Sequence, residues 1–330
     1  MTDEQEKREY FRRLYTEDPA KHYVRMHGWL EPARQRLQKI HSQGRRKTDF
    51  VKYFTFPGEY AIDVLLFAEN GILDENQLGF PGVVYCEKNI ETANVIGKKL
   101  GRCRAVFRDT FENAVRRKDF RTYCPFDIIN LDLTREIFPV WESTESKTIH
   151  AIEELLSLHK DCDFDLYLTF KSSPPETNKS AVREFIEMIN DNFTTHADLK
   201  QEFTRACGMD ATQLQKKNAT LFWCKSFPKW IFETSIVDDI AGSLQGEYVY
   251  SRESKNREIY HIVTFVFEFR RKKSGLMGRH KMIKDVHANV FGSFSVPPFD
   301  VDSHLKAHDG EKQNLKNDAI RLSKKPPKIA

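Results

Sequence analysis

The sequence has 330 residues, enough for one large α/β domain with additions or for two modest domains. Hydrophobic residues make up 40% of it and charged residues 30%, which excludes disorder of the whole chain, and the formal net charge is only +4. No stretch approaches the roughly 20 apolar residues of a membrane span, and the N-terminus is charged where a secretion signal is apolar. We therefore expect a cytoplasmic protein without membrane contact.

The first 50 residues predict one or two polar helices with a thin apolar stripe, and we treat residues 1–50 as a basic helical N-terminal extension. A basic cluster with a single acid lies in and just after this segment. Its members are Arg34, Arg36, Lys39, Arg45, Arg46, Lys47 and Lys52.

Residues 51–170 alternate apolar runs with amphipathic stretches at the spacing of strands and crossover helices. In chain order we predict strand 83–86, helix 90–100, strand 104–107, helix 111–120, strand 126–131, helix 149–158 and strand 164–170. This alternation predicts an α/β fold with a doubly wound, mostly parallel sheet. In such sheets the ligand binds beyond the carboxyl ends of the strands.

The C-terminal part has a different pattern. Aromatic and β-branched residues alternate at 248–250 and 260–269 around a polar turn, which predicts an antiparallel hairpin. We assign residues 51–302 to the main domain, and we expect the polar tail at 303–330 to be disordered. A second basic cluster with no acid inside it follows the hairpin, and it comprises Arg270, Arg271, Lys272, Lys273, Arg279, Lys281 and Lys284.

Acidic side chains recur where predicted strands end. Glu87 and Asp109 follow the first two of these strands, and Asn130 and Asp132 close the third. The intervals between successive acids each fit one crossover helix and one strand. A carboxylate at the end of the second strand of such a sheet accepts hydrogen bonds from both hydroxyls of a ribose, so the series indicates a nucleoside site. The alternative is that each acid caps the helix that follows it.

Because of these strand-end acids and the motifs around them, the chain resembles the class I, Rossmann-like S-adenosylmethionine-dependent methyltransferases over roughly residues 60–170. The run AIDVLLFAENGIL resembles the first motif of that family, a strand followed by a glycine loop. VVYCEKN resembles the second motif, FRDT the third and FDIINLDLT the fourth, and the C-terminal hairpin is similar to the reversed final strand pair. The Leu-Asp-Leu sequence in the fourth motif resembles the corresponding motif of RNA methyltransferases.

This resemblance implies that S-adenosylmethionine is the cofactor, and it implies roles for individual residues. Those expected to bind the cofactor are Asp63, Asn70, Gly71, Glu87 and Asp109. Asp132, with Asn130, is expected to face the methyl donor and the acceptor as the catalytic pair.

The first motif departs from the family pattern because it contains one glycine instead of a Gly-x-Gly loop. Residues 59–73 also fit an amphipathic helix with Gly71 near its end, in which case the first strand is lost or moved. The fourth motif lacks the Asp/Asn-Pro-Pro-aromatic set of the amino-methylating enzymes. The pair Cys124-Pro125 lies at the wrong end of its strand to serve as a cytosine-C5 nucleophile.

Metal chemistry has little support in the sequence. The six cysteines include no C-x-x-C pair, so neither a structural zinc site nor a disulfide framework is indicated. His304 and His308 form the only H-x-x-x-H spacing, in the polar tail with no third ligand in view, and we interpret it as chance. We predict no metal centre.

The favoured function is methyl transfer from S-adenosylmethionine to a nucleic acid, with RNA favoured over DNA. The residues expected to contact its phosphates are Arg45, Arg46, Lys47, Arg270, Arg271, Lys272 and Lys273. The alternative is an inactive methyltransferase-like domain that binds nucleic acid or a protein partner, for example in a bacterial antiviral defence system. A true glycine-loop conformation at residues 67–72 favours the enzyme, and a continuous helix favours the binding module.

Overall fold

The computed structural model describes residues 16–44, 49–133, 137, 147–172, 185–187, 189–191, 193, 197–237, 240–254, 257–271, 292 and 297–326. The elements before the middle of the chain are α2 (Pro19–Tyr23), the π-helix η1 (Val24–Leu30), α3 (Glu31–Ser42), β1 (Tyr53–Thr55), α4 (Ile62–Glu69), β2 (Gly79–Cys86), α5 (Ile90–Leu100), β3 (Arg102–Phe107), α6 (Phe111–Arg116), α7 (Lys118–Arg121), β4 (Ile128–Asp132), α8 (Lys147–Ser157) and β5 (Phe164–Lys171). Those after it are α10 (Ala197–Cys207), α11 (Ala211–Lys217), α12 (Ala219–Val237), β6 (Ile240–Glu253), β7 (Ile259–Arg271), β8 (Phe299–Asp300), α14 (Val301–Ala307) and α15 (Asp309–Ser323).

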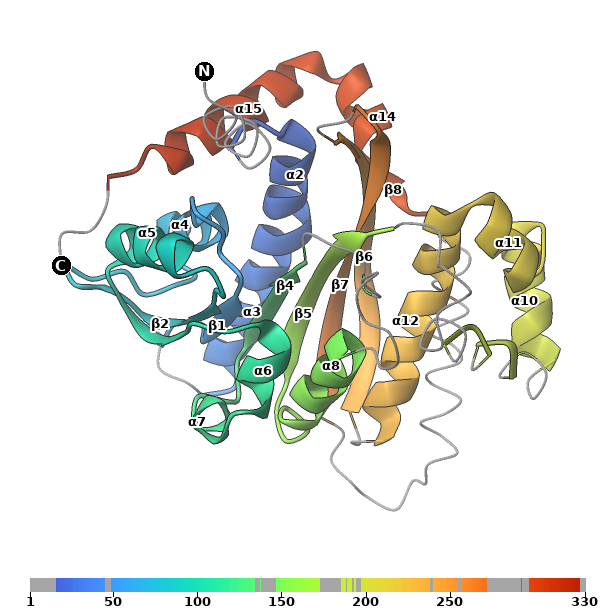
Figure 1. The fold of residues 1–330 in the computed structure, drawn as a ribbon, viewed down its shortest axis with the longest axis horizontal. Helices are drawn as coiled ribbons and strands as arrows, with labels where there is room; N and C mark the ends of the chain where they lie inside the picture. The colour runs from blue at the N-terminus through green and yellow to red at the C-terminus, as the bar shows by residue number, and fades with distance from the viewer. Residues whose placement is uncertain are drawn as a thin grey trace.

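The strands form one eight-stranded sheet in the order β3-β2-β1-β4-β5-β7-β6-β8 (Figure 1). β1 to β5 pair in parallel, while β7 is antiparallel to both β5 and β6. The α/β fold with a mostly parallel, doubly wound sheet is therefore confirmed, and so is the C-terminal hairpin. A parallel sheet with a reversed β7 between β5 and β6 is the Rossmann-like methyltransferase arrangement that the resemblance implied.

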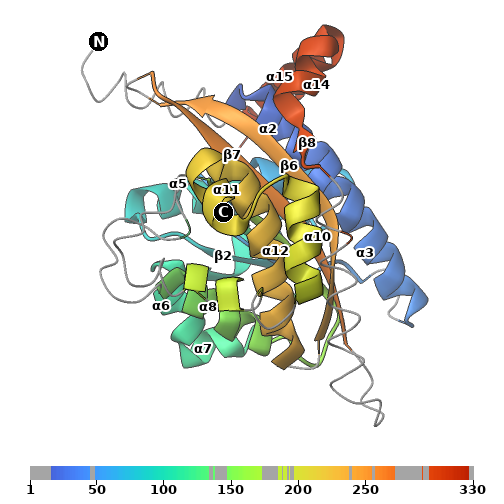
Figure 2. The same ribbon diagram turned by 90° about the vertical axis from the view of Figure 1, so that its right-hand side faces the viewer.

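Helices cover both faces of the sheet, so the strands alternate between two cores. On the face covered by α6, α8 and α12, Phe54 of β1 packs against Phe120 and Phe126, with ring centroids 5.2 and 5.3 Å apart. Burying such aromatic rings supplies much of the stability of a domain of this size. Figure 2 shows α2 and α3 on the opposite side of β6 and β7 from α12.

The second face is more polar, because α3 lies over charged strand residues. Arg36 forms a buried ion pair with Asp165 of β5, and Lys39 Nζ lies 2.6 Å from a carboxylate oxygen of Glu268 on β7. Two cations of the predicted first basic cluster are therefore paired with the sheet, and of these Arg36 is buried while Lys39 remains 38% exposed.

The first strand lies upstream of the segment that resembled the first motif. Residues 62–69 form helix α4, and the strand is the three-residue segment Tyr53–Thr55, so the strand-and-loop interpretation of AIDVLLFAENGIL is wrong. The helical alternative is correct in type, although the helix is shorter than the expected range 59–73 and is not amphipathic in the expected way. All six residues from Ile62 to Phe67 are buried. A helix with six buried residues in a row shows no clear polar face over that stretch, and its apolar run therefore looks like a buried strand.

The C-terminal tail is also different from the expectation. Residues 301–323 form α14 and α15 rather than a disordered segment, and the buried side chains of Leu305, Leu315 and Leu322 join the core on the α2 side. Arg321 of α15 forms a salt bridge to Glu69 of α4 at 2.8 Å. None of the helices in the described ranges combines the length and apolar character needed to cross a membrane.

Candidate functional site

A loop joins β1 to α4 at the carboxyl edge, where the strand order switches direction between β1 and β4. Gly58 in this loop has φ +59°, and Ala61 has φ +47°. A Cβ at Gly58 would meet nothing within 4 Å, so the backbone there borders open space. Ala61 is fully buried, and its left-handed conformation, which costs about 1 kcal/mol, is held by the packing around it. This loop follows the first strand of the sheet, and it lies upstream of residues 67–72, the segment that the sequence suggested.

Glu87 and Asp109 lie beside each other at the ends of β2 and β3. The backbone N–H of Glu87 donates to the carbonyl of Phe107 at 3.0 Å, and the Cys86 thiol donates to the Asp109 carbonyl at 3.0 Å. Both carboxyl-bearing residues are partly exposed. The structure thus brings together two of the predicted cofactor-binding acids at one edge.

Each of these acids also contributes to the start of the following helix. One oxygen of Glu87 accepts from the N–H of Asn89, the N-cap of α5, at 2.7 Å. One oxygen of Asp109 accepts from the N–H of Thr110 at 2.8 Å and from the Asn113 amide at 2.9 Å. The second oxygen of each carboxylate makes no hydrogen bond to the part of the chain that the structure describes. Helix capping and ligand binding are therefore compatible at both positions.

Asp63 and Asn130 belong to a buried polar network beneath this edge. One oxygen of Asp63 accepts from the hydroxyls of Tyr53 and Thr55, both at 2.7 Å, and from the Asn130 amide at 3.4 Å. Burial raises the pKa of Asp63, and the two hydroxyl donors partly offset that rise. Asn130 is fully buried, and its Oδ1 has no hydrogen-bond partner among the residues that the structure describes. These two predicted site residues join β1, β4 and α4, which positions the loop above them.

Asp132 closes β4 and is bound by a cation that the sequence did not point to. Lys21 of α2 forms an ion pair with the Asp132 carboxylate, whose side chain is 15% exposed while that of Lys21 is 2% exposed. Burial lowers the pKa of Lys21 to about 8. Arg252 of β6 is buried next to this pair and bonds Asp18 at 2.8 Å. The predicted catalytic acid therefore has a fixed orientation at the strand end.

Asn70 and Gly71 lie at the other end of α4, and the structure does not bring them to the strand ends. The Asn70 amide oxygen accepts from Arg34 of α3 at 2.6 Å. The carbonyl of Ile72, directly after them, accepts from the N–H of Val51, which precedes β1. They thus stand near the amino edge of the sheet, opposite Glu87 and Asp109. The glycine-loop conformation is absent at residues 67–72, because Phe67 and its two successors belong to helix α4. This is the outcome that the sequence analysis associated with a binding module. The loop with left-handed residues instead lies upstream, at residues 56–61, directly after β1.

The described members of the second basic cluster are also at the amino edge. Arg270 Nε lies 3.0 Å from Glu268, and Arg271 Nη2 lies 3.9 Å from Asp161. Their side chains remain 63% and 56% exposed, so surface charge is still available there. The other predicted phosphate contacts lie outside the described residues, and these are Arg45, Arg46, Lys47, Lys272 and Lys273.

A pocket with an acidic lining lies away from the strand ends, between α3 and the β6–β7 hairpin. Its walls include Lys39, Asp165, Tyr248 and Glu268. Two of these acids are the buried partners of Arg36 and Lys39. The pocket is therefore separate from the edge that carries Glu87 and Asp109.

Three groups at the carboxyl edge were not found from the sequence: Gly58, Lys21 and Arg252. Gly58 follows a strand of only three residues, too short for a periodicity signal. Lys21 and Arg252 are separated from their partners by 111 and 234 residues in the chain. A lone sequence carries no signal that links residues so far apart.

Comparison with known proteins adds a family and a few distant structures. A protein-family model described as PP_RS20740-like matches residues 17–324. No curated protein matches the chain. The crystal structure of the putative RNA methyltransferase PH1948 from Pyrococcus horikoshii is 13% identical, covering 73% of this chain and 84% of that one, with a TM-score of 0.31. TYW2 from M. jannaschii, in complex with AdoMet, is 11% identical over 71% of this chain and 76% of its own, with a TM-score of 0.32. Similarity at this level carries no argument, and the fold follows from the strand order of the chain itself.

Proposed function

The chain belongs to the PP_RS20740-like family, and we propose that it is an S-adenosylmethionine-dependent methyltransferase that acts on nucleic acid, with RNA favoured over DNA. The observation that carries the proposal is that Glu87 and Asp109 lie at neighbouring strand ends, on the carboxyl edge of a sheet with a reversed β7. Two carboxylates at adjacent strand ends, each with one oxygen that makes no hydrogen bond to the described residues, are suited to a nucleoside with hydroxyl and amino donors.

The residues at this edge fit the cofactor. Glu87 would accept from the ribose hydroxyls, and Asp109 would accept from the adenine amino group. The backbone at Gly58 borders open space, which leaves room for the amino-acid end of the cofactor without a Cβ in the way. When bound, S-adenosylmethionine supplies an electrophilic methyl group.

Asp132 is the residue we assign to the acceptor. Asp132 closes β4, which lies next to β1. Thr55, the last residue of β1, is in register with Asn130, so Asp132 lies beside the loop that follows Thr55. The Lys21 ion pair holds the carboxylate in a fixed orientation, so that it can orient an acceptor or take its proton. Asn130 acts as a positioning residue, because it is fully buried beneath this edge.

Nucleic acid is the proposed substrate class because of the basic clusters and the Leu-Asp-Leu sequence at the fourth motif. Arg270 and Arg271 keep more than half of their side-chain surface exposed at the amino edge. A polynucleotide bound there would have to extend to the opposite edge to present its acceptor. Such a path across the surface suits a long substrate better than a short one.

Methyl transfer from labelled S-adenosylmethionine to RNA and to DNA tests the proposal. We expect label in RNA with the intact protein and a loss of about a hundredfold or more in the Asp132→Asn variant, since the acceptor loses its base. Asp198→Asn is the matched control, because Asp198 is exposed in the first turn of α10. Salt-dependent nucleic-acid binding without any methyl transfer would contradict the enzymatic proposal and leave a binding module.

A further inference from the structure

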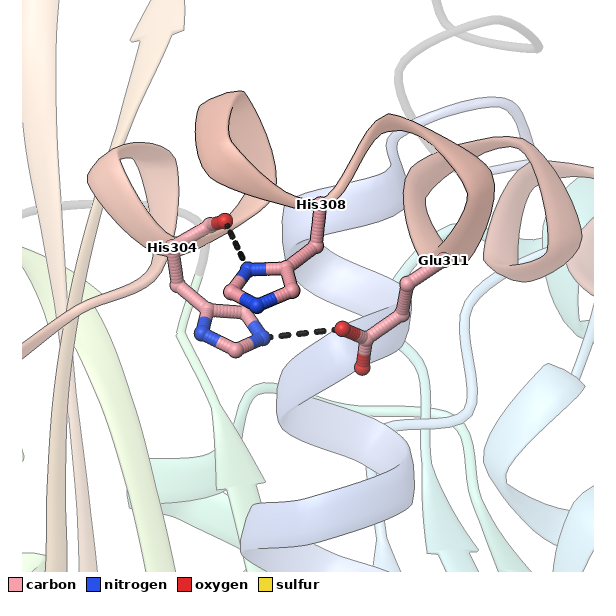
Figure 3. A group of neighbouring side chains, drawn as sticks. All are labelled: His304, His308 and Glu311. Atoms are coloured by element: carbon pink, nitrogen blue, oxygen red, sulfur yellow. Dashed lines mark hydrogen bonds and ion pairs between the residues drawn. The ribbon is translucent and has the colours of Figure 1, made fainter.

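Two histidines and a glutamate from the C-terminal helices face one another on the surface. The ligand atoms of His304, His308 and Glu311 all lie within 4.8 Å of one another. His304 belongs to α14, Glu311 to the first turn of α15, and His308 to the junction of the two helices. Figure 3 shows both imidazole rings and the carboxylate turned toward a common space. Glu311 is the third ligand that the sequence spacing alone did not reveal.

The hydrogen bond that His308 makes through Nδ1 leaves its Nε2 available to bind a metal ion. Its Nδ1 lies 2.9 Å from the carbonyl oxygen of His304, and a carbonyl only accepts, so Nδ1 carries the proton. In the neutral ring Nε2 then has a free lone pair. A hydrogen bond from the other ring nitrogen to a backbone carbonyl is the arrangement that orients histidine ligands in metal sites.

The other two ligands are already close together. His304 Nε2 lies 2.8 Å from an oxygen of Glu311, and the rings of His304 and His308 stack at 4.3 Å. Binding an ion here moves the His304 proton from Nε2 to Nδ1 and replaces the hydrogen bond with two bonds to the metal, so no net proton is needed or released. Ligands in a tetrahedral site at bond lengths of about 2 Å stand roughly 3.3 Å apart, which small side-chain rotations reach from these positions.

The surroundings hold the two helices to the N-terminal segment. The His304 ring packs against Tyr23 at 5.1 Å and Phe299 at 5.4 Å, and its side chain is 26% exposed. His27 of η1 lies 3.7 Å from the second oxygen of Glu311. An aromatic shell restricts the orientation of the ligand rings and limits access of water to them.

We propose that His304, His308 and Glu311 bind one zinc ion, with water in the fourth position. Imidazole nitrogens and one carboxylate form a donor set that Zn²⁺ favours and that Mg²⁺ and Ca²⁺, which prefer oxygen ligands, do not. The ion would fasten the α14–α15 junction next to the helix that carries Lys21. This site lies apart from Glu87 and Asp109, so it is independent of the proposed function.

Titration of the metal-free full-length protein with Zn²⁺ by calorimetry tests the site, with Co²⁺ absorption as a probe of tetrahedral geometry. We expect one ion per chain at micromolar affinity or tighter. His308→Ala and Glu311→Gln should each weaken it about tenfold or more. His308 is exposed, and among the described residues its side chain hydrogen-bonds the carbonyl of His304, four residues earlier, so His308→Ala should fold normally, as the circular dichroism spectrum checks.

The matched control is His150→Ala, which removes an ordinary surface pair of a histidine and a glutamate, His150 and Glu153, 3.1 Å apart on α8. Zinc affinity should be unchanged in it. Zn²⁺ should also raise the melting temperature of the intact protein and of His150→Ala, but not that of His308→Ala. Absence of saturable one-to-one binding, or equal affinity in His308→Ala, would overturn the proposal.

Discussion

Lys21 donates to the carboxylate of Asp132 from a helix that precedes the whole sheet, 111 residues away in the chain. The cation is buried, so its charge depends on this one partner and on the arginines around it. The pair thus couples the N-terminal helix to the acid at the end of β4. It also accounts for why residues 19–42 pack on the sheet instead of standing apart as an extension.

This burial has a consequence for stability at alkaline pH. The pKa of Lys21 is lowered from 10.5 to about 8 in the folded protein, so between these values the unfolded chain binds more protons. Stability from this group therefore rises with pH across that window. We expect Lys21→Met to remove the rise, measured by urea unfolding at both ends of the window. Lys160→Met, at an exposed position, should keep it, and a Lys21→Met protein with an unaltered pH slope would contradict the assignment.

Arg36 should contribute far more to the free energy of unfolding than Arg34 on the same helix. Removing Arg36 leaves Asp165 buried without its partner, and Arg36→Leu should lower the free energy of unfolding by about 3–5 kcal/mol. Arg34 is 44% exposed and pairs with exposed Glu31, so Arg34→Leu should cost less than about 1 kcal/mol. Denaturant unfolding of the two variants makes the comparison. Equal costs would show that the buried pair does not hold α3 on the sheet.

The buried, neutral ring of His159 leads us to predict that the protein loses stability in mild acid. Its Nε2 accepts from the N–H of Phe126 at 2.9 Å while Nδ1 donates to the carbonyl of Leu155 at 2.7 Å, so the ring must be neutral. Burial lowers its pKa from 6.5 to about 4, and the unfolded chain binds more protons between these values. Stability should therefore fall by about 2 kcal/mol between about pH 7 and pH 5 because of this residue.

The test for His159 is the pH slope of urea unfolding in His159→Gln, which cannot be protonated. The slope should be shallower than in the unmodified protein, whereas His150→Gln, at an exposed position, should leave it unchanged. An unchanged slope in His159→Gln would assign the acid sensitivity to other groups.

Gly79, at the start of β2, cannot be replaced by any residue with a Cβ. Its φ is +143°, and an added Cβ would lie 2.3 Å from the backbone nitrogen of Arg102 and 2.6 Å from the carbonyl oxygen of Leu100. Gly79→Ala should therefore destabilise the protein by about 3 kcal/mol or more in denaturant unfolding. Gly310→Ala, where nothing lies within 4 Å, should be neutral or stabilising by up to about 1 kcal/mol. Similar effects at both positions would contradict the β2–β3 contact.

The sequence predicted those elements whose residues form long buried runs. The strands that became β2, β4 and β5 and the hairpin of β6 and β7 were expected because apolar and β-branched residues gather there, whereas β3 was expected from a short run at 104–107 of which only Phe107 is buried. Glu87, Asp109 and Asp132 were predicted at strand ends, and the structure places them there. Their roles in binding and catalysis stay predictions.

What the sequence did not reveal depends on contacts between distant segments. β1 has three residues, too few to show a period, and the continuous buried run Ile62–Phe67 fitted a strand as well as the helix α4. The tail was expected to be disordered because α15 is mostly polar, yet Leu315 and Leu322 anchor it to the core. The partner of each buried cation, such as Asp132 for Lys21, becomes visible only once the chain is folded.

Calorimetry with S-adenosylmethionine tests the central claim most directly. We expect one cofactor molecule per chain and about tenfold or greater weakening in Glu87→Ala, because a carboxylate that accepts from the ribose hydroxyls would be lost. Asp161→Ala, on the opposite edge of the sheet, should bind as the unmodified protein does. No binding by the intact protein, or equal affinity in Glu87→Ala, would contradict a nucleoside site at the ends of β2 and β3.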